Sequence, residues 1–149
     1  MTIDQEVELL RNIPLFAKVD PAKLKLLAFA SERAVFAPGE TLFHQGDPGD
    51  AAYIIMEGEA EVLINGPSGP IAVATIGKND FVGEIAILCD VPRTATIRSR
   101  TALTTLRITK DLFLRMLMDF PAIAIEVTRV LAQRLEHTTE RLRDALARK

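Results

Sequence analysis

Residues 81–96 combine four features that suit the binding of an anionic sugar: a glycine, a carboxylate, a short apolar turn and an arginine followed by small residues. A backbone turn with free N–H groups binds anions, and the planar guanidinium of Arg93 matches the oxygens of a phosphate. The carboxylate of Glu84 suits sugar hydroxyls, which donate hydrogen bonds to it. Gly83 allows the backbone to approach a ligand closely. Together these residues predict a pocket for a sugar phosphate.

A purely structural alternative stays open at this point. In it, Glu84 and Arg93 form an ion pair in a polar loop between strands, and no ligand is involved. Other reactive side chains add no competing chemistry, because the chain has one cysteine and two histidines. Neither an internal disulfide nor a zinc cluster is therefore expected. No arrangement of nucleophile, base and acid is recognisable, so we expect neither a metal site nor an enzyme.

The composition is that of one globular domain. With 149 residues, 48% of them apolar and 26% charged, the chain can bury a core but is too short for two ordinary domains. Its net charge of −2 gives no electrostatic reason to expect binding to nucleic acid or to an anionic membrane. No apolar run approaches the ~20 residues of a membrane span, and the N-terminus lacks the basic start of a signal peptide. We therefore expect a cytoplasmic protein.

Helical patterns occupy both ends of the chain, and strand patterns occupy the middle. Residues 4–12 and the segment from Asp20 to about Arg33 carry apolar residues at helical spacing. From Lys110 the helical period returns, and a last helix about 40 Å long is expected over 122–147. Between these ends, turn signals separate short β-rich runs, which predicts a sandwich or barrel. The runs are 41–44, 52–56, 60–64, 71–76, 94–99 and 103–108.

The last helix carries a seam that suggests a partner. Residues at alternating intervals of four and three are typical of a two-helix coiled coil. They are Ala124, Thr128, Leu131, Leu135, Thr138, Leu142 and Ala145. We expect a homodimer through this helix, and the alternative is a monomer whose last helix folds back over the pocket.

The order and spacing of short motifs point to a known family. Residues 81–96 read F-x-G-E-x-A-x-L followed by P-R-T-A-T. The motifs upstream of it are Pro14-Leu15-Phe16, Phe36-x-x-Gly39-Glu40, Phe43-x-Gln45-Gly46-Asp47 and Tyr53-Ile54-Ile55-x-x-Gly58. This series resembles cyclic nucleotide-binding domains, in which residues 81–96 would be the phosphate-binding cassette. The resemblance is closest to the ligand-binding half of bacterial catabolite-activator (CRP/FNR-type) proteins.

The resemblance implies a fold and a ligand. The fold is α+β but mainly β: N-terminal helices over about 1–33, a β jelly roll over 34–109 and C-terminal helices over 110–149. The ligand is a cyclic nucleotide, cAMP in preference to cGMP, with no further cofactor. By this resemblance, Glu84 holds the ribose 2′-hydroxyl and Arg93 holds the exocyclic phosphate oxygens. Further contacts are expected from Gly83, Ile85, Ala86, Thr94 and Ala95.

Four residues are matched to the base, each with a simpler alternative. Val62 and Val73 correspond to strand positions that line the base pocket, although core packing explains them equally well. Thr138 and Thr139 correspond to the two hydroxyl positions on the catabolite-activator helix that reach the adenine amino group. A hydroxyl both donates and accepts hydrogen bonds, so it can meet either purine. The alternative is that both threonines are solvated.

Two functions follow from the resemblance. The first is a cyclic nucleotide sensor that signals through its last helix to a protein effector, which the sequence does not identify. The second is the ligand-binding part of a DNA-binding regulator, because a helix-turn-helix domain follows the long helix in catabolite activators. The 149 residues contain no such recognition helix. We therefore expect no direct binding of this chain to nucleic acid or to a membrane.

Overall fold

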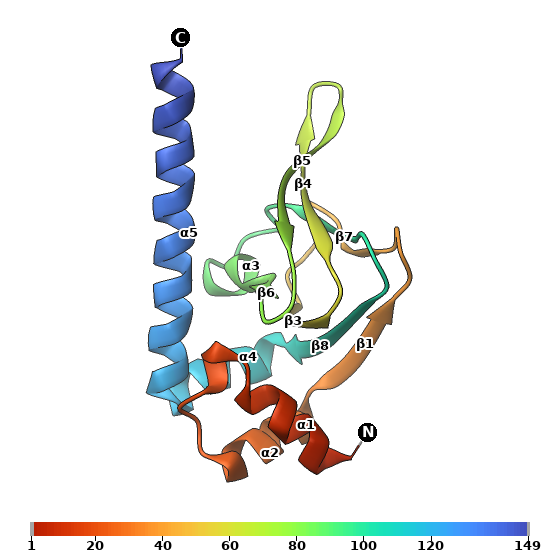
Figure 1. The fold of residues 1–149 in the computed structure, drawn as a ribbon, viewed down its shortest axis with the longest axis vertical. Coiled ribbons are helices and arrows are strands. Elements are labelled where there is room, and N and C mark those ends of the chain that lie inside the picture. Colours follow the sequence, from red (N-terminus) through yellow and green to blue (C-terminus); the bar gives the residue numbers. More distant parts are fainter. Residues whose placement is uncertain (1, 149) are drawn as a thin grey trace.

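The computed structural model describes residues 2–148 and places two antiparallel β-sheets beside a long C-terminal helix, with the N-terminal helices at one end (Figure 1). The helices are α1 (Ile3–Arg11), η1 (Pro14–Phe16), α2 (Pro21–Ala30), α3 (Glu84–Leu88), α4 (Lys110–Asp119) and α5 (Pro121–Ala147). The strands are β1 (Glu32–Phe36), β2 (Thr41–Phe43), β3 (Ala51–Glu57), β4 (Ala60–Gly66), β5 (Gly69–Ile76), β6 (Phe81–Val82), β7 (Thr96–Ser99) and β8 (Leu103–Thr109). The expected fold, mainly β with flanking helices, is confirmed.

The two sheets have the strand orders β1-β8-β3-β6 and β2-β7-β4-β5. Side chains alternate between the two faces of a strand, and β3 uses both faces for burial. Tyr53 and Ile55 of β3 belong to one buried cluster with Ile97 of the other sheet. Ile54, between them, belongs to a second cluster, which the terminal helices supply with residues such as Phe16. The first sheet is thus buried between the second sheet and the helices.

The second helix is shorter than its pattern predicts. We expected it to continue to about Arg33, but α2 ends at Ala30 and β1 begins at Glu32. Ser31 adopts an extended backbone (φ −91°, ψ 165°), and its hydroxyl donates to the carbonyl oxygen of Leu27 at 2.8 Å. The backbone N–H of Ser31 donates to the same carbonyl oxygen at 3.0 Å, so the helix ends because the extended backbone of Ser31 turns the chain out of the helical path. Strand β1 then pairs with β8.

The last helix is packed at its start and exposed along the rest of its length. Ile123 and Val127 are buried against the domain, whereas residues 132–148 are exposed except for the half-buried Arg134. Helix α5 stands at one edge of the molecule, and its C-terminal end and the tip of the β4–β5 hairpin both extend away from the N-terminal helices (Figure 1). Leu135 and Leu142 of the predicted seam are 68% and 59% exposed. No helix within residues 2–148 has the length and hydropathy needed to cross a membrane.

Candidate functional site

A cavity of about 400 Å³ lies between the cassette, the second sheet and α5. All seven residues predicted to contact phosphate and ribose line it: Gly83, Glu84, Ile85, Ala86, Arg93, Thr94 and Ala95. Of the four residues matched to the base, Val62 and Thr138 line the cavity. The sequence pattern did not assign other lining residues, which include Phe43, Asp80, Arg134, His137 and Arg141.

The cassette turns sharply at Gly83. This residue has φ +87°, in the left-handed region that favours glycine. A Cβ atom there would lie 2.6 Å from Nη1 of Arg93 and 3.0 Å from the carbonyl oxygen of Ala51. Helix α3 begins at the next residue, and the N–H groups of its first turn have no acceptor within the helix. Glycine at this position therefore lets the backbone reach the guanidinium of Arg93 and turn its N–H groups into the cavity wall.

Arg93 is held rigidly inside the protein and is only 3% exposed. Its Nη1 donates to the carbonyl oxygen of Gly83 at 2.9 Å, and its Nη2 donates to that of Ala51 at 2.7 Å. Nη2 also lies 3.3 Å from the carboxylate of Asp50. Burial lowers the pKa of Arg93 while Asp50 opposes that shift, and the guanidinium stays charged at any physiological pH.

One nitrogen of Arg93 makes no hydrogen bond within residues 2–148. Its Nε is the buried side-chain nitrogen or oxygen that has no hydrogen-bond partner within residues 2–148. Phe43 covers the face of the guanidinium, with the ring centroid 3.9 Å from the Cζ atom of Arg93. A buried donor without a partner costs free energy, typically about 1–3 kcal/mol. An acceptor supplied by a ligand would remove that cost.

Glu84 is the second buried charge of the cavity, with 2% of the residue exposed. Its Oε1 accepts a hydrogen bond from Nη1 of Arg134 at 2.8 Å, and Nη2 of Arg134 donates to the carbonyl oxygen of Phe81 at 2.8 Å. The structural alternative, an ion pair between Glu84 and Arg93, is wrong for the residues described: Glu84 pairs with Arg134, and Arg93 pairs with Asp50. Burial raises the pKa of Glu84, and Arg134 opposes this shift.

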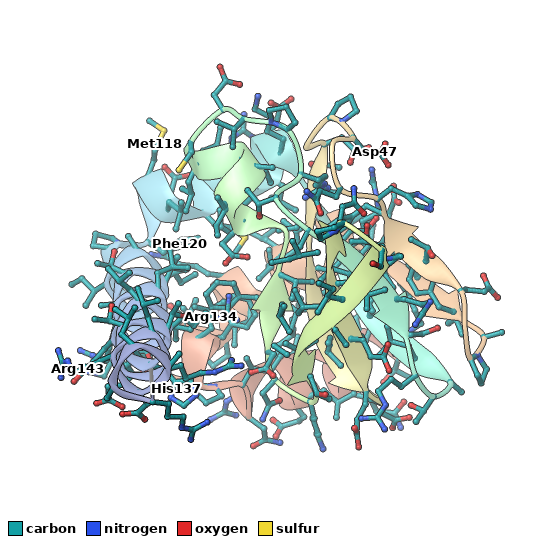
Figure 2. All side chains as sticks on the ribbon, turned by 90° about the horizontal axis from the view of Figure 1, so that it is seen from above. Asp47, Met118, Phe120, Arg134, His137 and Arg143 are labelled. Carbon is teal, nitrogen blue, oxygen red and sulfur yellow. The ribbon has the colours of Figure 1, made fainter. Side chains whose placement is uncertain are left out.

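One face of α5 forms the outer wall of the cavity. Arg134, His137, Thr138 and Arg141 follow at intervals that place them on the same side of a helix. In the view along α5, Arg134 lies on the side toward the sheets and Arg143 on the opposite side (Figure 2). The last helix therefore does lie over the pocket, as the monomer alternative required. A dimer through the exposed seam stays a prediction.

Two of the four residues matched to the base, Thr139 and Val73, do not line the cavity of their own chain. Thr139 is about 100° around the helix from Thr138, and its hydroxyl donates to the carbonyl oxygen of Leu135 at 2.8 Å. Val73 falls at an irregularity in the pairing of β4 with β5, where Val62 faces Ala74 and Leu63 faces Ala72. Val73 has no residue opposite it in the strand pairing, as in a β-bulge, and it does not line the cavity, unlike the family position to which it was matched.

The raised pKa of Glu84 predicts a pH-dependent stability. A carboxyl group that binds its proton more tightly when folded stabilises the protein below its ordinary pKa of 4.5. That contribution is lost as the pH rises through the higher folded pKa. Glu84→Gln removes this dependence, so the variant should gain stability relative to the wild type as the pH rises from about 4 to 7. Urea unfolding at several pH values measures the difference.

The matched control is Glu136→Gln, which neutralises an exposed carboxylate on α5. Its stability relative to the wild type should stay nearly constant over the same pH range. Equal pH dependence of the two variants would contradict the assignment of the buried charge to Glu84.

Comparison with known proteins agrees with this geometry. Residues 33–120 match the family model of the cyclic nucleotide-binding domain. The chain is 38% identical over 108 residues to a cAMP-dependent protein kinase regulatory subunit of Yarrowia lipolytica, covering 72% of this chain and 28% of that protein. It is 31% identical over 140 residues to a CRP-like cAMP-activated global transcriptional regulator of Mycobacterium tuberculosis, covering 93% of this chain and 62% of that protein.

A solved structure gives the same result. The N-terminal domain of a transcriptional regulator from Streptomyces coelicolor superimposes with a TM-score of 0.66 and 34% identity, over 89% of this chain and 95% of that one. The chain belongs to the cyclic nucleotide-binding domain family. It spans between about a quarter and two thirds of the length of the curated relatives it matches.

Proposed function

We propose that this protein is a cyclic nucleotide sensor whose ligand is cAMP and whose output passes through α5. The observation that carries the proposal is the unpartnered Nε of the buried Arg93 in a cavity that also holds the buried Glu84. Arg93 supplies a fixed positive charge, and its Nε supplies a donor for an anionic oxygen. Glu84 supplies an acceptor for a hydroxyl. A cyclic phosphate fused to a ribose presents both groups side by side.

The size of the cavity and the relatives support the same ligand. About 400 Å³ lies in the range of pockets for small molecules, roughly 300–1,000 Å³, and suits a single nucleotide. The relatives in Yarrowia and Mycobacterium are both described by their response to cAMP. The presence of Glu84 and Arg93 in one cavity favours binding of the same class of ligand here.

The proposed route of the signal starts at Glu84. Arg134 of α5 binds the carboxylate that we assign to the ribose. A ribose hydroxyl that donates to Glu84 shares this carboxylate with Arg134, so ligand and helix bind the same group. Such a differential contact is what a ligand needs in order to shift a conformational equilibrium. The exposed Leu135 and Leu142 then offer α5 to a second copy of the chain or to a protein effector.

Isothermal titration with four nucleotides tests the ligand. We expect saturable one-to-one binding of cAMP per chain and weaker binding of 2′-deoxy-cAMP, which lacks the hydroxyl for Glu84. Linear 5′-AMP, which carries a second negative charge and lacks the cyclic phosphate ring, should bind more weakly still. The fourth nucleotide is cGMP. No binding of any of the four at millimolar concentration would overturn the proposal.

The two adjacent threonines provide a test of the base contact and of the route through α5. Thr138→Ala should lower the affinity for cAMP by about tenfold, because a hydroxyl within the cavity is lost. Thr139→Ala is the matched control, because its hydroxyl bonds to the backbone outside the cavity; within one chain it should change affinity by less than about twofold. A large effect of Thr139→Ala that disappears in a monomeric variant would assign Thr139 to a partner's cavity instead.

Backbone hydrogen exchange with and without cAMP completes that test. We expect protection both in the cassette, 83–96, and in α5 over 127–142. Protection of the cassette alone would contradict signalling through α5 while leaving the ligand assignment intact.

The second candidate function is that of a ligand-binding part of a DNA-binding regulator. It is supported by the match to 93% of this chain in the Mycobacterium regulator and by the Streptomyces N-terminal domain. Detection of the protein in its own cells by antibody separates the two. A band at 16.4 kDa favours the sensor, and a larger polypeptide that contains this sequence favours the regulator.

A further inference from the structure

Two donor side chains of the cavity wall were not assigned by the sequence pattern or by the proposed function. His137 and Arg141 lie one helical turn apart on α5, and both line the cavity. Nη1 of Arg141 donates to the carbonyl oxygen of Val73 on β5 at 3.3 Å. This contact holds the guanidinium across the gap between α5 and β5 but uses only one of its five N–H donors. The side chain of His137 makes no hydrogen bond within residues 2–148.

Their position along α5 places them away from the sugar phosphate. Arg134 contacts Glu84, and Arg141 lies seven residues further on, about 10 Å along the helix. The contact of Arg141 with Val73 places it beside the part of the cavity that Val62 and Ala74 line. If the phosphate and ribose occupy Arg93 and Glu84, the base must extend toward this end. Arg141 and His137 then face an edge of the base.

The chemistry of the two side chains discriminates between purines. Guanine presents two acceptors on one edge, N7 and O6, and arginine pairs with both. Adenine presents the N7 acceptor beside an N6 amino group, and this amino group is a donor that an arginine cannot bind. Asp80 is a carboxylate in the cavity wall, and its Oδ2 accepts a hydrogen bond from the N–H of Gly77 at 2.9 Å.

We infer that Arg141, with His137 as a second donor, recognises a 6-oxopurine, so that the site binds cGMP in addition to cAMP. Arg141 donates to O6 and N7, and Thr138 supplies the hydroxyl that suits either base. The inference rests on the proposed function, because it requires a cyclic nucleotide anchored at Arg93 and Glu84. Base recognition is therefore a property of α5, the element that also receives the signal.

Titration of cAMP, cGMP and cyclic inosine monophosphate into Arg141→Ala tests this inference. The inosine nucleotide has O6 but lacks the 2-amino group, so it isolates the contact to O6. We expect cGMP and the inosine nucleotide to lose about tenfold or more in affinity, and cAMP to lose less than about threefold. His137→Ala should show the same selectivity with a smaller loss of about threefold.

Arg143→Ala is the matched control, because it removes the same charge from the opposite side of α5 (Figure 2). It should change the affinity for all three nucleotides by less than about twofold. Urea unfolding verifies that each variant is folded before its affinity is compared.

Two results would overturn the inference without touching the proposed function. One is an equal loss for all three nucleotides in Arg141→Ala, which would mean that Arg141 only holds α5 against β5. The other is a wild-type protein that binds both 6-oxopurine nucleotides more than about thirtyfold more weakly than cAMP. Failure of the wild type to bind any of the three would instead refute the proposed function.

Discussion

Replacing Arg93 with alanine is expected to lower the affinity for cAMP by roughly 30- to 700-fold, equivalent to about 2–4 kcal/mol. The variant loses the fixed charge of the cavity and the Nε donor that has no partner within residues 2–148. It also leaves the carbonyl oxygens of Gly83 and Ala51 without their donor. Isothermal titration gives the loss of affinity, and urea unfolding gives the accompanying loss of stability.

Two further variants keep this experiment interpretable if Arg93→Ala folds poorly. Arg93→Lys retains the charge but lacks the planar fork, so it should recover only part of the affinity. Arg98→Ala removes an exposed arginine that pairs with Glu61 on the second sheet, and it should bind cAMP as the wild type does. An affinity of Arg93→Ala within about twofold of the wild type would show that Arg93 has only a structural role.

Gly83→Ala should damage both the fold and the site. The residue has φ +87°, which costs a side-chain-bearing residue about 1–2 kcal/mol. The added Cβ would also meet Nη1 of Arg93 at 2.6 Å and the carbonyl oxygen of Ala51 at 3.0 Å. Because Arg93 cannot yield without breaking its hydrogen bonds, we expect the affinity for cAMP to fall by at least about tenfold.

Gly39 provides the matched control for this prediction. It has nearly the same φ, +86°, but a Cβ there would have no heavy atom within 4 Å. Gly39→Ala should therefore lose a similar amount of stability from backbone strain and keep its affinity for cAMP. Thermal unfolding and titration of both variants separate strain from displacement of Arg93. Equal affinities in the two variants would show that the space around Gly83 is not needed for binding.

The cassette could be predicted from the sequence because its residues are neighbours in the chain. Gly83, Glu84 and Arg93 lie within eleven residues, and the turn and short helix between them bring all three to one cavity. Arg134 could not be found in this way. Its contact with Glu84 joins residues 50 positions apart, and one arginine on a charged helix carries no local signal. Phe43 matched a family motif, but its stacking on Arg93 depends on the packing of the two sheets.

Other differences between the predictions and the structure have local causes, and some of them could have been predicted from the sequence. Thr139 is about 140° around α5 from Arg134, so helical geometry places it away from the face on which Arg134, His137 and Thr138 line the cavity. The end of α2 depends on the backbone of Ser31, and no proline or glycine marks this position in the sequence. The irregularity at Val73 depends on the register between β4 and β5, and a strand pattern contains no information about its partner's register.

Because α5 is packed against the domain at its start and exposed beyond it, the helix has the geometry of a lever. Its pivot is near the buried Val127, and Arg134 lies 7 residues beyond that point, whereas Ala147 lies 20 residues beyond it. These separations correspond to arms of about 10 Å and 30 Å. A rotation of about 5° about this point would shift Arg134 by roughly 0.9 Å and the far end by roughly 2.6 Å. Under the proposed function, a sub-ångström displacement of Arg134 would reach the tip of the helix magnified about threefold.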